Sequence, residues 1–196
     1  REGSIYSTIT EVVEEIGVNV VVLGTHGKSG LQYLFGSRAL KVVLSLPVPV
    51  LIVQQNSGTS NYDDLLFPVS DSGDDRQKVR FAINVAKTFN STIHILKEHF
   101  SSPEYRSRVN IISGQIAQAF EKHKVKYQVH EQKQSGDFAN FAINYANENQ
   151  IDAILIVTTA GDTPFETWFL KNDEKVIFNK YDIPVITINP VDFGLK

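Results

Sequence analysis

Glycine and hydroxyl-bearing residues between positions 24 and 37 are spaced in a way that suits phosphate binding. Glycine has no Cβ and takes positive φ freely, so successive backbone N–H groups can form an anion-binding concavity. A helix that begins just after would add free N–H groups and the positive end of its dipole. A glycine-rich connection between a strand and a helix, without any ligand, explains the spacing equally well. The residues concerned are Gly24, Gly27, Gly30, Gly36 and Ser37.

Two familiar nucleotide motifs do not account for this segment. The letters GKS at 27–29 resemble the end of a P-loop, but Val22 stands where the first P-loop glycine is required. The dinucleotide fingerprint G-x-G-x-x-G is also absent, because two residues separate Gly24 from Gly27. A phosphate site here would therefore belong to another class.

The surrounding pattern predicts the elements that would position such a site. Residues 5–16 have helical periodicity, 18–23 form an apolar β-branched run, 37–46 favour a helix and 48–54 a second buried strand. From Asp63 onward we expect five strands alternating with four helices, which indicates an α/β fold with an open parallel sheet. The expected strands are 65–71, 92–98, 126–132, 151–159 and 183–190, and the expected helices are 74–90, 105–123, 136–150 and 172–181.

The chain contains an internal repeat. VNVVVLGTHG aligns with IDAILIVTTA, and PVLIV aligns with PVITI. We therefore expect residues 1–55 to be the C-terminal part of a first domain, 56–62 a linker and 63–196 a complete second domain. Residues 18–23 would be a central strand in a complete first copy, so we expect about three upstream strands that this sequence does not include; strands supplied by another chain are the alternative.

The segment GTHGKSGLQYLFGS, followed by ALKVVLSLPVPVLIVQ, resembles the universal stress protein family. The family's ATP-binding signature is Gly-x2-Gly, nine residues, then Gly-Ser or Gly-Thr. Here Gly24 and Gly27 are followed by eight residues and then by Gly36 and Ser37, one residue fewer than the signature. The resemblance covers the whole chain as a tandem, two-domain form with its first copy incomplete.

The resemblance implies a Rossmann-like five-stranded parallel sheet, in the order 3-2-1-4-5, with ATP at the carboxyl ends of strands 1 and 4. AMP and ADP are the alternative nucleotides, and Mg is the ion expected to accompany them. The resemblance also implies antiparallel pairing of residues 50–53 with 185–188, giving an intramolecular pseudo-dimer; a homo-oligomer is left open. The cofactor-binding residues carried over are Gly24, Thr25, His26, Gly27, Gly30, Gly36, Ser37 and Arg38, with Asp71 in a second, degenerate site.

The second copy lacks the glycine loop. Val157 and Ala160 stand where the first copy has Gly24 and Gly27, and acidic residues around this loop would repel phosphate. Asp71 is the last residue of the first expected strand of the second copy, where the resemblance implies an acidic group near ribose and adenine; a turn or helix-cap role is the favoured interpretation. Trp168, with Phe165 and Phe169, is expected to fill the vacated pocket; a patch that docks a partner is the second interpretation. Because half of the adenine pocket is missing, we expect this chain to bind nucleotide weakly or not at all.

Composition excludes several other functions. The net charge is −3, with no basic cluster, which argues against nucleic acid. No apolar run approaches the ~20 residues that span a bilayer. The chain has no cysteine, which fits a reducing compartment, and we expect the cytoplasm.

A nucleotide-binding stress-response or regulatory protein is therefore the leading hypothesis, and we expect no catalytic or metal-ligating residues. A slow ATP hydrolase, with His26 as its one candidate base, and a nucleotide-free scaffold acting through the pseudo-dimer surface are the alternatives. His94, His99, His123 and His130 show no metal-ligand spacing and are predicted at the surface or at strand edges.

Overall fold

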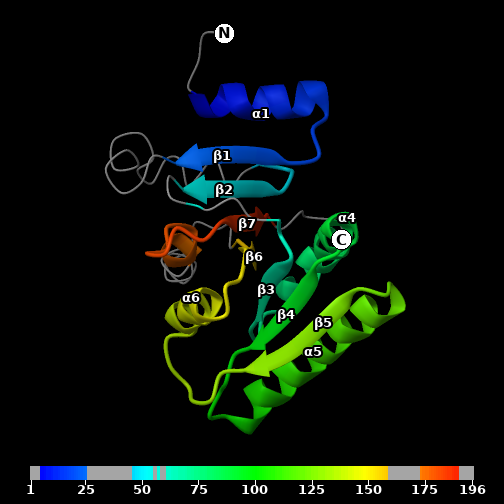
Figure 1. Ribbon diagram of the computed structural model, residues 1–196, viewed down its shortest axis with the longest axis vertical. Coiled ribbons are helices and arrows are strands. Elements are labelled where there is room, and N and C mark those ends of the chain that lie inside the picture. Colours follow the sequence, from blue (N-terminus) through cyan, green and yellow to red (C-terminus); the bar gives the residue numbers. More distant parts are fainter. Residues whose placement is uncertain (1–4, 26–45, 55–56, 58–60, 159–172, 190–196) are drawn as a thin grey trace.

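The protein is built on one mixed sheet with helices on both faces (Figure 1). The computed structural model describes residues 5–25, 46–54, 57, 61–158 and 173–189. Their strands form a seven-stranded sheet in the order β1-β2-β7-β6-β3-β4-β5. The strands are β1 (Val21–Thr25), β2 (Val50–Gln54), β3 (Asp64–Val69), β4 (Thr92–Lys97), β5 (Lys126–Glu131), β6 (Ala153–Val157) and β7 (Val185–Ile188). The helices are α1 (Ile5–Ile16), the 3₁₀ helix η1 (Gly73–Lys78), α4 (Val79–Phe89), α5 (Pro103–Lys122) and α6 (Phe138–Glu148), with a further helical turn at 173–177.

The α/β class is confirmed, but the sheet is larger than the predicted five strands. Strands β3 to β7 are mutually parallel and lie in the order β5-β4-β3-β6-β7, which is the expected 3-2-1-4-5 arrangement. Strands β1 and β2 extend this set because β2 pairs with β7. The predicted number of strands was too small because it counted the strands of each repeat as a separate sheet.

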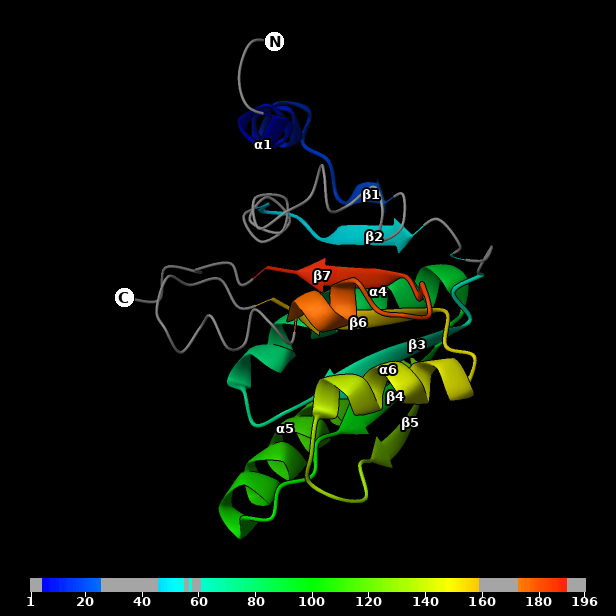
Figure 2. The same cartoon turned by 90° about the vertical axis from the view of Figure 1, so that its left-hand side faces the viewer.

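The junction between β2 and β7 is antiparallel, as expected for residues 50–53 and 185–188. Val50 lies opposite Thr187, Leu51 opposite Ile186 and Ile52 opposite Val185. Figure 2 shows the arrows of β2 and β7 running in opposite directions. Because β1 is parallel to β2, the carboxyl ends of β1 and β2 lie at one end of the sheet and those of β3 to β7 at the other.

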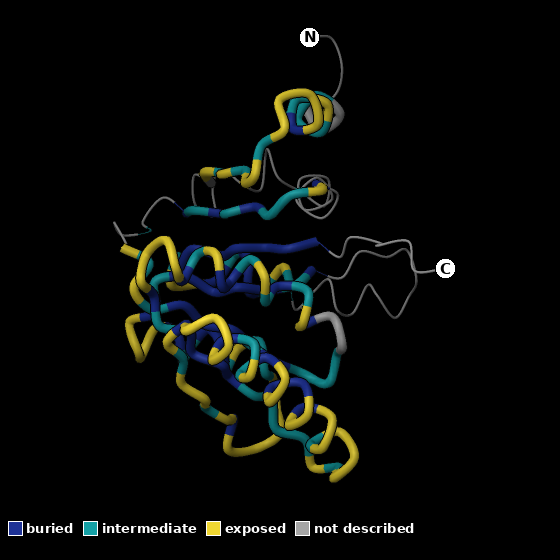
Figure 3. The backbone as a smooth tube through the Cα atoms, turned by 90° about the vertical axis from the view of Figure 1, so that its right-hand side faces the viewer, coloured by how far each residue is buried: buried dark blue, intermediate teal, exposed yellow. Residues whose placement is uncertain are grey.

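Each face of the sheet has its own hydrophobic core. On one face, residues such as Phe67, Ile95 and Leu155 pack against α4 and α5. On the other, Leu66, Leu96 and Ile154 pack against α6 and the turn at 173–177, and this core continues to Val50, Ile52 and Val13. Strand β7 alternates between the faces, with Val185 in one core and Ile186 in the other. The central strands are accordingly buried along their length (Figure 3).

Local sequence explains where the helices begin and end. Pro103 opens α5, where a missing N–H costs nothing, and Asp137 caps α6 by accepting the backbone N–H of Asn140. Asn90 ends α4 in the left-handed conformation (φ 58°). The predicted helix 74–90 is wrong at its start, because residues 73–78 form a 3₁₀ helix instead.

Strand β1 lies at the edge of the sheet. Within the described part of the chain it pairs with β2 alone, whereas β6, its counterpart in the repeat, pairs with β3 and β7. Val22 is 58% exposed, in contrast to the buried side chains of β6. None of the described helices has the length and apolar character needed to cross a membrane.

We expect Ile186→Ala to destabilise the fold by about 2–5 kcal/mol, because the side chain is 4% exposed and fills the core beside the β2–β7 junction. Urea unfolding followed by circular dichroism measures the loss. Ile111→Ala is the matched control, since Ile111 is 56% exposed on α5 and its truncation should change stability by less than about 0.5 kcal/mol. Equal effects for the two variants would contradict this assignment of the core.

Candidate functional site

The predicted phosphate loop leaves the carboxyl end of β1. Gly24 and Thr25 are the last two residues of β1 and lie opposite Val53 and Gln54 of β2. Open α/β sheets bind ligands outside the carboxyl ends of their strands. The other expected loop residues, His26, Gly27, Gly30, Gly36, Ser37 and Arg38, lie outside the described residues, as does Trp168.

Gly24 is not explained by packing or by backbone conformation. It does not have a left-handed φ, it is exposed, and a Cβ added there would meet no atom within 4 Å. The described fold would therefore accept a side chain at this position. A glycine that neither packing nor backbone conformation requires, at the carboxyl end of a strand, fits a role in letting a ligand approach the backbone closely.

The carboxyl end of β2 is fastened to the turn that precedes β7. The side-chain amide of Gln54 donates to the backbone oxygen of Asn179 (3.3 Å), and the Ser57 hydroxyl donates to the backbone oxygen of Asp182 (2.6 Å). Asn179 is 2% exposed, and its carboxamide accepts from the N–H of Ile183 (3.0 Å) and donates to its oxygen (2.8 Å). These contacts hold the end of β2 beside the loop in a fixed place.

A matching contact fastens the carboxyl end of β7 to the other half of the chain. The side-chain amide of Asn189 donates to the backbone oxygen of Leu46 (2.7 Å), in the segment that precedes β2. Thr158 donates its hydroxyl to the Asn189 carboxamide. Asn189 follows PVITI as Gln54 follows PVLIV, so equivalent carboxamides make reciprocal contacts across the β2–β7 junction.

Asp71 lies just beyond the carboxyl end of β3, at the opposite end of the sheet from Gly24. The antiparallel junction makes this separation unavoidable. The structure therefore does not bring the glycine loop and the Asp71 carboxylate into one site. Asp71 is half-buried in the connection between β3 and η1.

A buried ion pair occupies the segment that follows β3. The Lys78 ammonium is 1% exposed, donates to Asp75 Oδ1 (2.8 Å) and to the Pro68 oxygen, and lies 4.4 Å from the centre of the Phe67 ring. The other Asp75 oxygen accepts the Ser70 N–H (2.8 Å). Burial lowers the pKa of Lys78, and the attraction of Asp75 opposes this shift. η1 packs against β6, so this ion pair lies at the point where the strand order reverses.

Glu98, just past the carboxyl end of β4, has a perturbed carboxyl group. Burial raises its pKa to about 7, and the negative charges of Asp71 and Asp75 add to the effect. Its backbone N–H donates to the Val69 oxygen (2.9 Å), which places it beside the end of β3. The carboxyl ends of β3 and β4 thus carry a cluster of acidic groups, which disfavours a phosphate.

Two histidines that the sequence assigned to the surface or to strand edges form a polar chain on the α6 side of the sheet. His94 is 9% exposed, so its predicted location is wrong, and it also has a carboxylate partner: Asp64 Oδ1 lies 2.7 Å from His94 Nε2. His130 Nε2 lies 3.3 Å from His94 Nδ1. His130 lies on the edge strand β5 and His123 is exposed, as predicted, while His99 lies 3.5 Å from a Glu131 oxygen. Register explains the pairing: parallel pairing sets Leu96 opposite His130, so His94 and His130 face the same side two residues apart.

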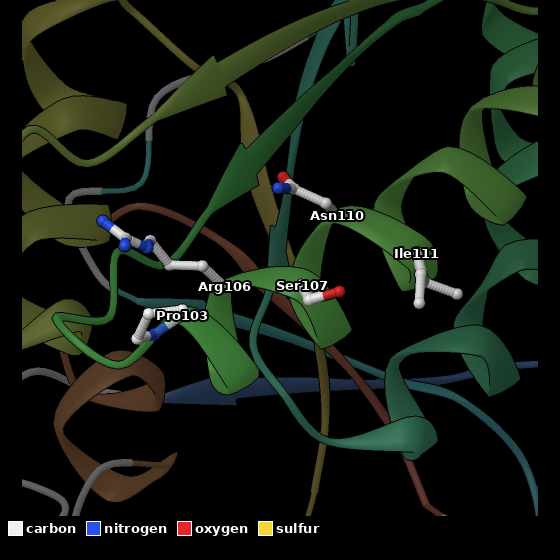
Figure 4. A pocket seen from close by; sticks show the side chains of 5 residues that line it. All are labelled: Pro103, Arg106, Ser107, Asn110 and Ile111. Carbon is white, nitrogen blue, oxygen red and sulfur yellow. The ribbon is translucent and has the colours of Figure 1, made fainter.

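A shallow hollow on α5 is a weaker candidate. Its volume is about 460 Å³, and one helix supplies all the lining side chains (Figure 4), so it does not converge groups from different elements. The lining residues are Pro103, Arg106, Ser107, Asn110 and Ile111. Within the described residues, no group of three or more His, Asp or Glu side chains is placed to hold a metal ion.

Residues 1–54 match the sequence profile of the Universal stress protein family. Universal stress protein G of Shigella flexneri is 39% identical over 54 residues, which are 28% of this chain and 38% of that protein. This chain therefore matches well under half of the length of such relatives.

Solved structures extend the likeness to the rest of the fold. A universal stress protein from Archaeoglobus fulgidus superposes with a TM-score of 0.71 over 95% of this chain and 66% of its own, at 20% identity. A second, from the same organism and in complex with dAMP, has a TM-score of 0.53 at 18% identity and covers 66% of this chain and all of its own. The family resemblance is confirmed: residues 1–54 have universal stress protein sequence, and the described chain has the universal stress protein fold.

Replacing Glu98 should flatten the pH dependence of stability. A raised pKa in the folded state means that the folded protein holds this proton more tightly, so stability falls as pH rises from about 4.5 through about 7. The loss should be about 2 kcal/mol, less than the full linkage value because the side chain is only partly buried. Urea unfolding of the wild type and Glu98→Gln at pH 5, 6, 7 and 8 measures it.

The control is Glu121→Gln at the exposed end of α5, which should keep the wild-type pH profile. If Glu98→Gln loses as much stability between pH 5 and pH 8 as the wild type does, Glu98 does not titrate as described.

Proposed function

We propose that this protein is a cytoplasmic regulatory or stress-response protein that binds an adenine nucleotide through the glycine loop after β1. The observation that carries the proposal is Gly24, a glycine without steric duty at the carboxyl end of a strand, within the family-matching residues 1–54. ATP is the proposed ligand, with AMP or ADP as alternatives and Mg as the accompanying ion. The dAMP complex of a protein with the same fold supports an adenine nucleotide.

The proposed phosphate cradle combines the loop with the start of the next helix. Gly24, Thr25, Gly27 and Gly30 would offer backbone N–H groups, Gly36 and Ser37 the helix N-terminus, and His26 and Arg38 further donors. Gln54, held by Asn179, would fix the end of β2 beside Thr25, the last described residue before the loop.

The chain would be organised as a tandem, with residues 1–55 from a first domain, 56–62 as linker and 63–196 as a second domain. The reciprocal contacts of Gln54 and Asn189 support this view, because equivalent residues of a repeat make equivalent contacts about a pseudo-twofold axis. Residues 50–53 and 185–188 would then form the interface of an internal pseudo-dimer.

The second domain would be structural rather than nucleotide-binding. At the switch point of its strands, η1 and the buried Lys78–Asp75 pair fill the segment beside β6, and Glu98 and Asp71 add negative charge. Both features oppose a triphosphate. Asp71 would therefore have a structural role in the turn after β3 rather than bind a ribose.

The first site would need one more strand. In the second domain, β6 is flanked by β3, which carries Asp71 at its end; the equivalent edge of β1 is unpaired within the described residues. We propose that a further strand of the full-length protein pairs there and supplies the side of the pocket that contacts adenine. The 196-residue chain alone should then bind ATP weakly or not at all.

Calorimetric titration of the full-length gene product with ATP and Mg tests the proposal. We expect binding, and we expect Gly24→Val to weaken it at least roughly tenfold, because its side chain would obstruct phosphate contacts worth about 1–2 kcal/mol. Gly24→Val should unfold like the wild type, since a Cβ there has open space.

Two control variants make this test specific. Gly114→Ala, in α5, also places a Cβ in open space but lies outside the loop, and Asp71→Asn alters the second domain; both should bind ATP as the wild type does. The absence of ATP binding by the intact protein, or unchanged affinity in Gly24→Val, would refute the proposed site.

A further inference from the structure

Three side chains from three neighbouring strands form a continuous hydrogen-bonded chain. Asp64 Oδ1 on β3 lies 2.7 Å from His94 Nε2 on β4, and His94 Nδ1 lies 3.3 Å from His130 Nε2 on β5. The imidazole planes are 14° apart with centres 5.4 Å apart, so the rings meet nearly edge to edge. His130 lies beside α6, whose Tyr145 ring is centred 5.3 Å from that of His130.

The Asp64 carboxylate fixes the protons of this chain. It can only accept, so His94 carries its proton on Nε2 and presents Nδ1 as an acceptor. His130 must then donate from Nε2. One added proton preserves this arrangement, because a single imidazolium can still share one N–H···N bond with a neutral ring. A second added proton makes both rings positively charged and points the N–H of His94 Nδ1 at the N–H of His130 Nε2. The Asp64 carboxylate can offset only one of the two charges.

The surroundings offer the second charge little relief. Asp64 faces the pair from β3, and Asp152 lies behind it, accepting the Asp64 backbone N–H (2.9 Å). The α6 side contributes the phenol of Tyr145, which is neutral. On β5 itself, Lys126 lies on the same face four residues from His130 and adds positive charge. His94 is buried, so water cannot readily solvate an imidazolium there, while His130 is partly exposed.

We propose that the Asp64–His94–His130 chain is an acid-operated latch that holds β4, β5 and α6 together while it carries at most one added proton and opens at the second. Opening separates His130 from His94 and loosens the contact of β5 with α6. The expected role is a conformational response to acidification, at a place remote in sequence from the glycine loop and independent of nucleotide binding.

The electrostatics of His130 agree with this geometry. Burial lowers the pKa of His130, and the adjacent His94 adds to the effect. A histidine whose pKa is depressed in the folded state contributes stability above about pH 6.5 that is lost as pH falls below it. Glu98 acts in the opposite direction, so the latch is best detected by comparing variants rather than from the wild-type profile alone.

Proton-detected ¹⁵N spectra of the imidazoles in the wild-type chain test the latch without any substitution. We expect His94 to carry its proton on Nε2 at pH 8, and both rings to respond to two separate protonation steps, as coupled groups do. Amide exchange in β5 should accelerate by up to about tenfold for each pH unit between the imidazole pKa of the opened state, about 6.5, and the second step of the closed state, beyond the intrinsic pH dependence of exchange, because one further proton is linked to opening in that window. EDTA in all samples excludes bridging metal ions.

His130→Gln is the diagnostic variant, since its amide can still donate to His94 but does not titrate. It should retain the stability measured at pH 8 and lose less stability than the wild type between pH 7 and pH 5; His123→Asn, at the exposed end of α5, should behave as the wild type. Independent single-step titration of the two rings, or the same loss of stability in His130→Gln as in the wild type, would overturn the latch.

Discussion

The antiparallel pairing of β2 with β7 is the constraint on which the arrangement of this protein depends. It joins two sets of parallel strands into one sheet and lets both hydrophobic cores run on across the junction, through Ile52 and Val185 on one face and Leu51 and Ile186 on the other. It uses the hydrogen-bonding edges of two short strands that would otherwise be open to association. The carboxamides of Gln54 and Asn189 lock the junction at its two ends.

The same pairing decides at which end of the sheet each candidate binding residue lies. Ligands of open α/β sheets bind at carboxyl ends, and an antiparallel junction sends the two sets of carboxyl ends in opposite directions. Gly24 and Asp71 therefore cannot contribute to one site within a single chain, although each lies at or just beyond the carboxyl end of a strand. The two ends have also diverged chemically, since one exposes an unhindered glycine and the other buries an ammonium with its carboxylate.

Much of the fold was predictable because its signals are local and repeated. Apolar runs at 151–157 and 183–188 and the alignment of PVLIV with PVITI give the α/β class and the repeat, whereas the strand order of the second set and the partners at the junction came from the resemblance to the universal stress protein family. The seven-strand width of the sheet was missed, because strands were counted for each repeat separately and the two sets join only through the pairing of β2 with β7. The 3₁₀ start at residues 73–78 was also missed, because the helical periodicity does not show that Asp75 and Lys78 form a buried pair three residues apart in this segment.

The perturbed side chains were beyond the reach of sequence because they depend on the register of parallel strands far apart in the chain. Nothing in TIHILK or KYQVHE says that His94 and His130 meet, nor that Asp64 lies beside them; a shift of one residue in β5 would turn His130 to the other face. Glu98 likewise acquires its raised pKa from burial beside the end of β3 and, to a smaller extent, from Asp71 and Asp75, which follow a different strand. Parallel sheets thus create electrostatic sites between residues that no local motif connects.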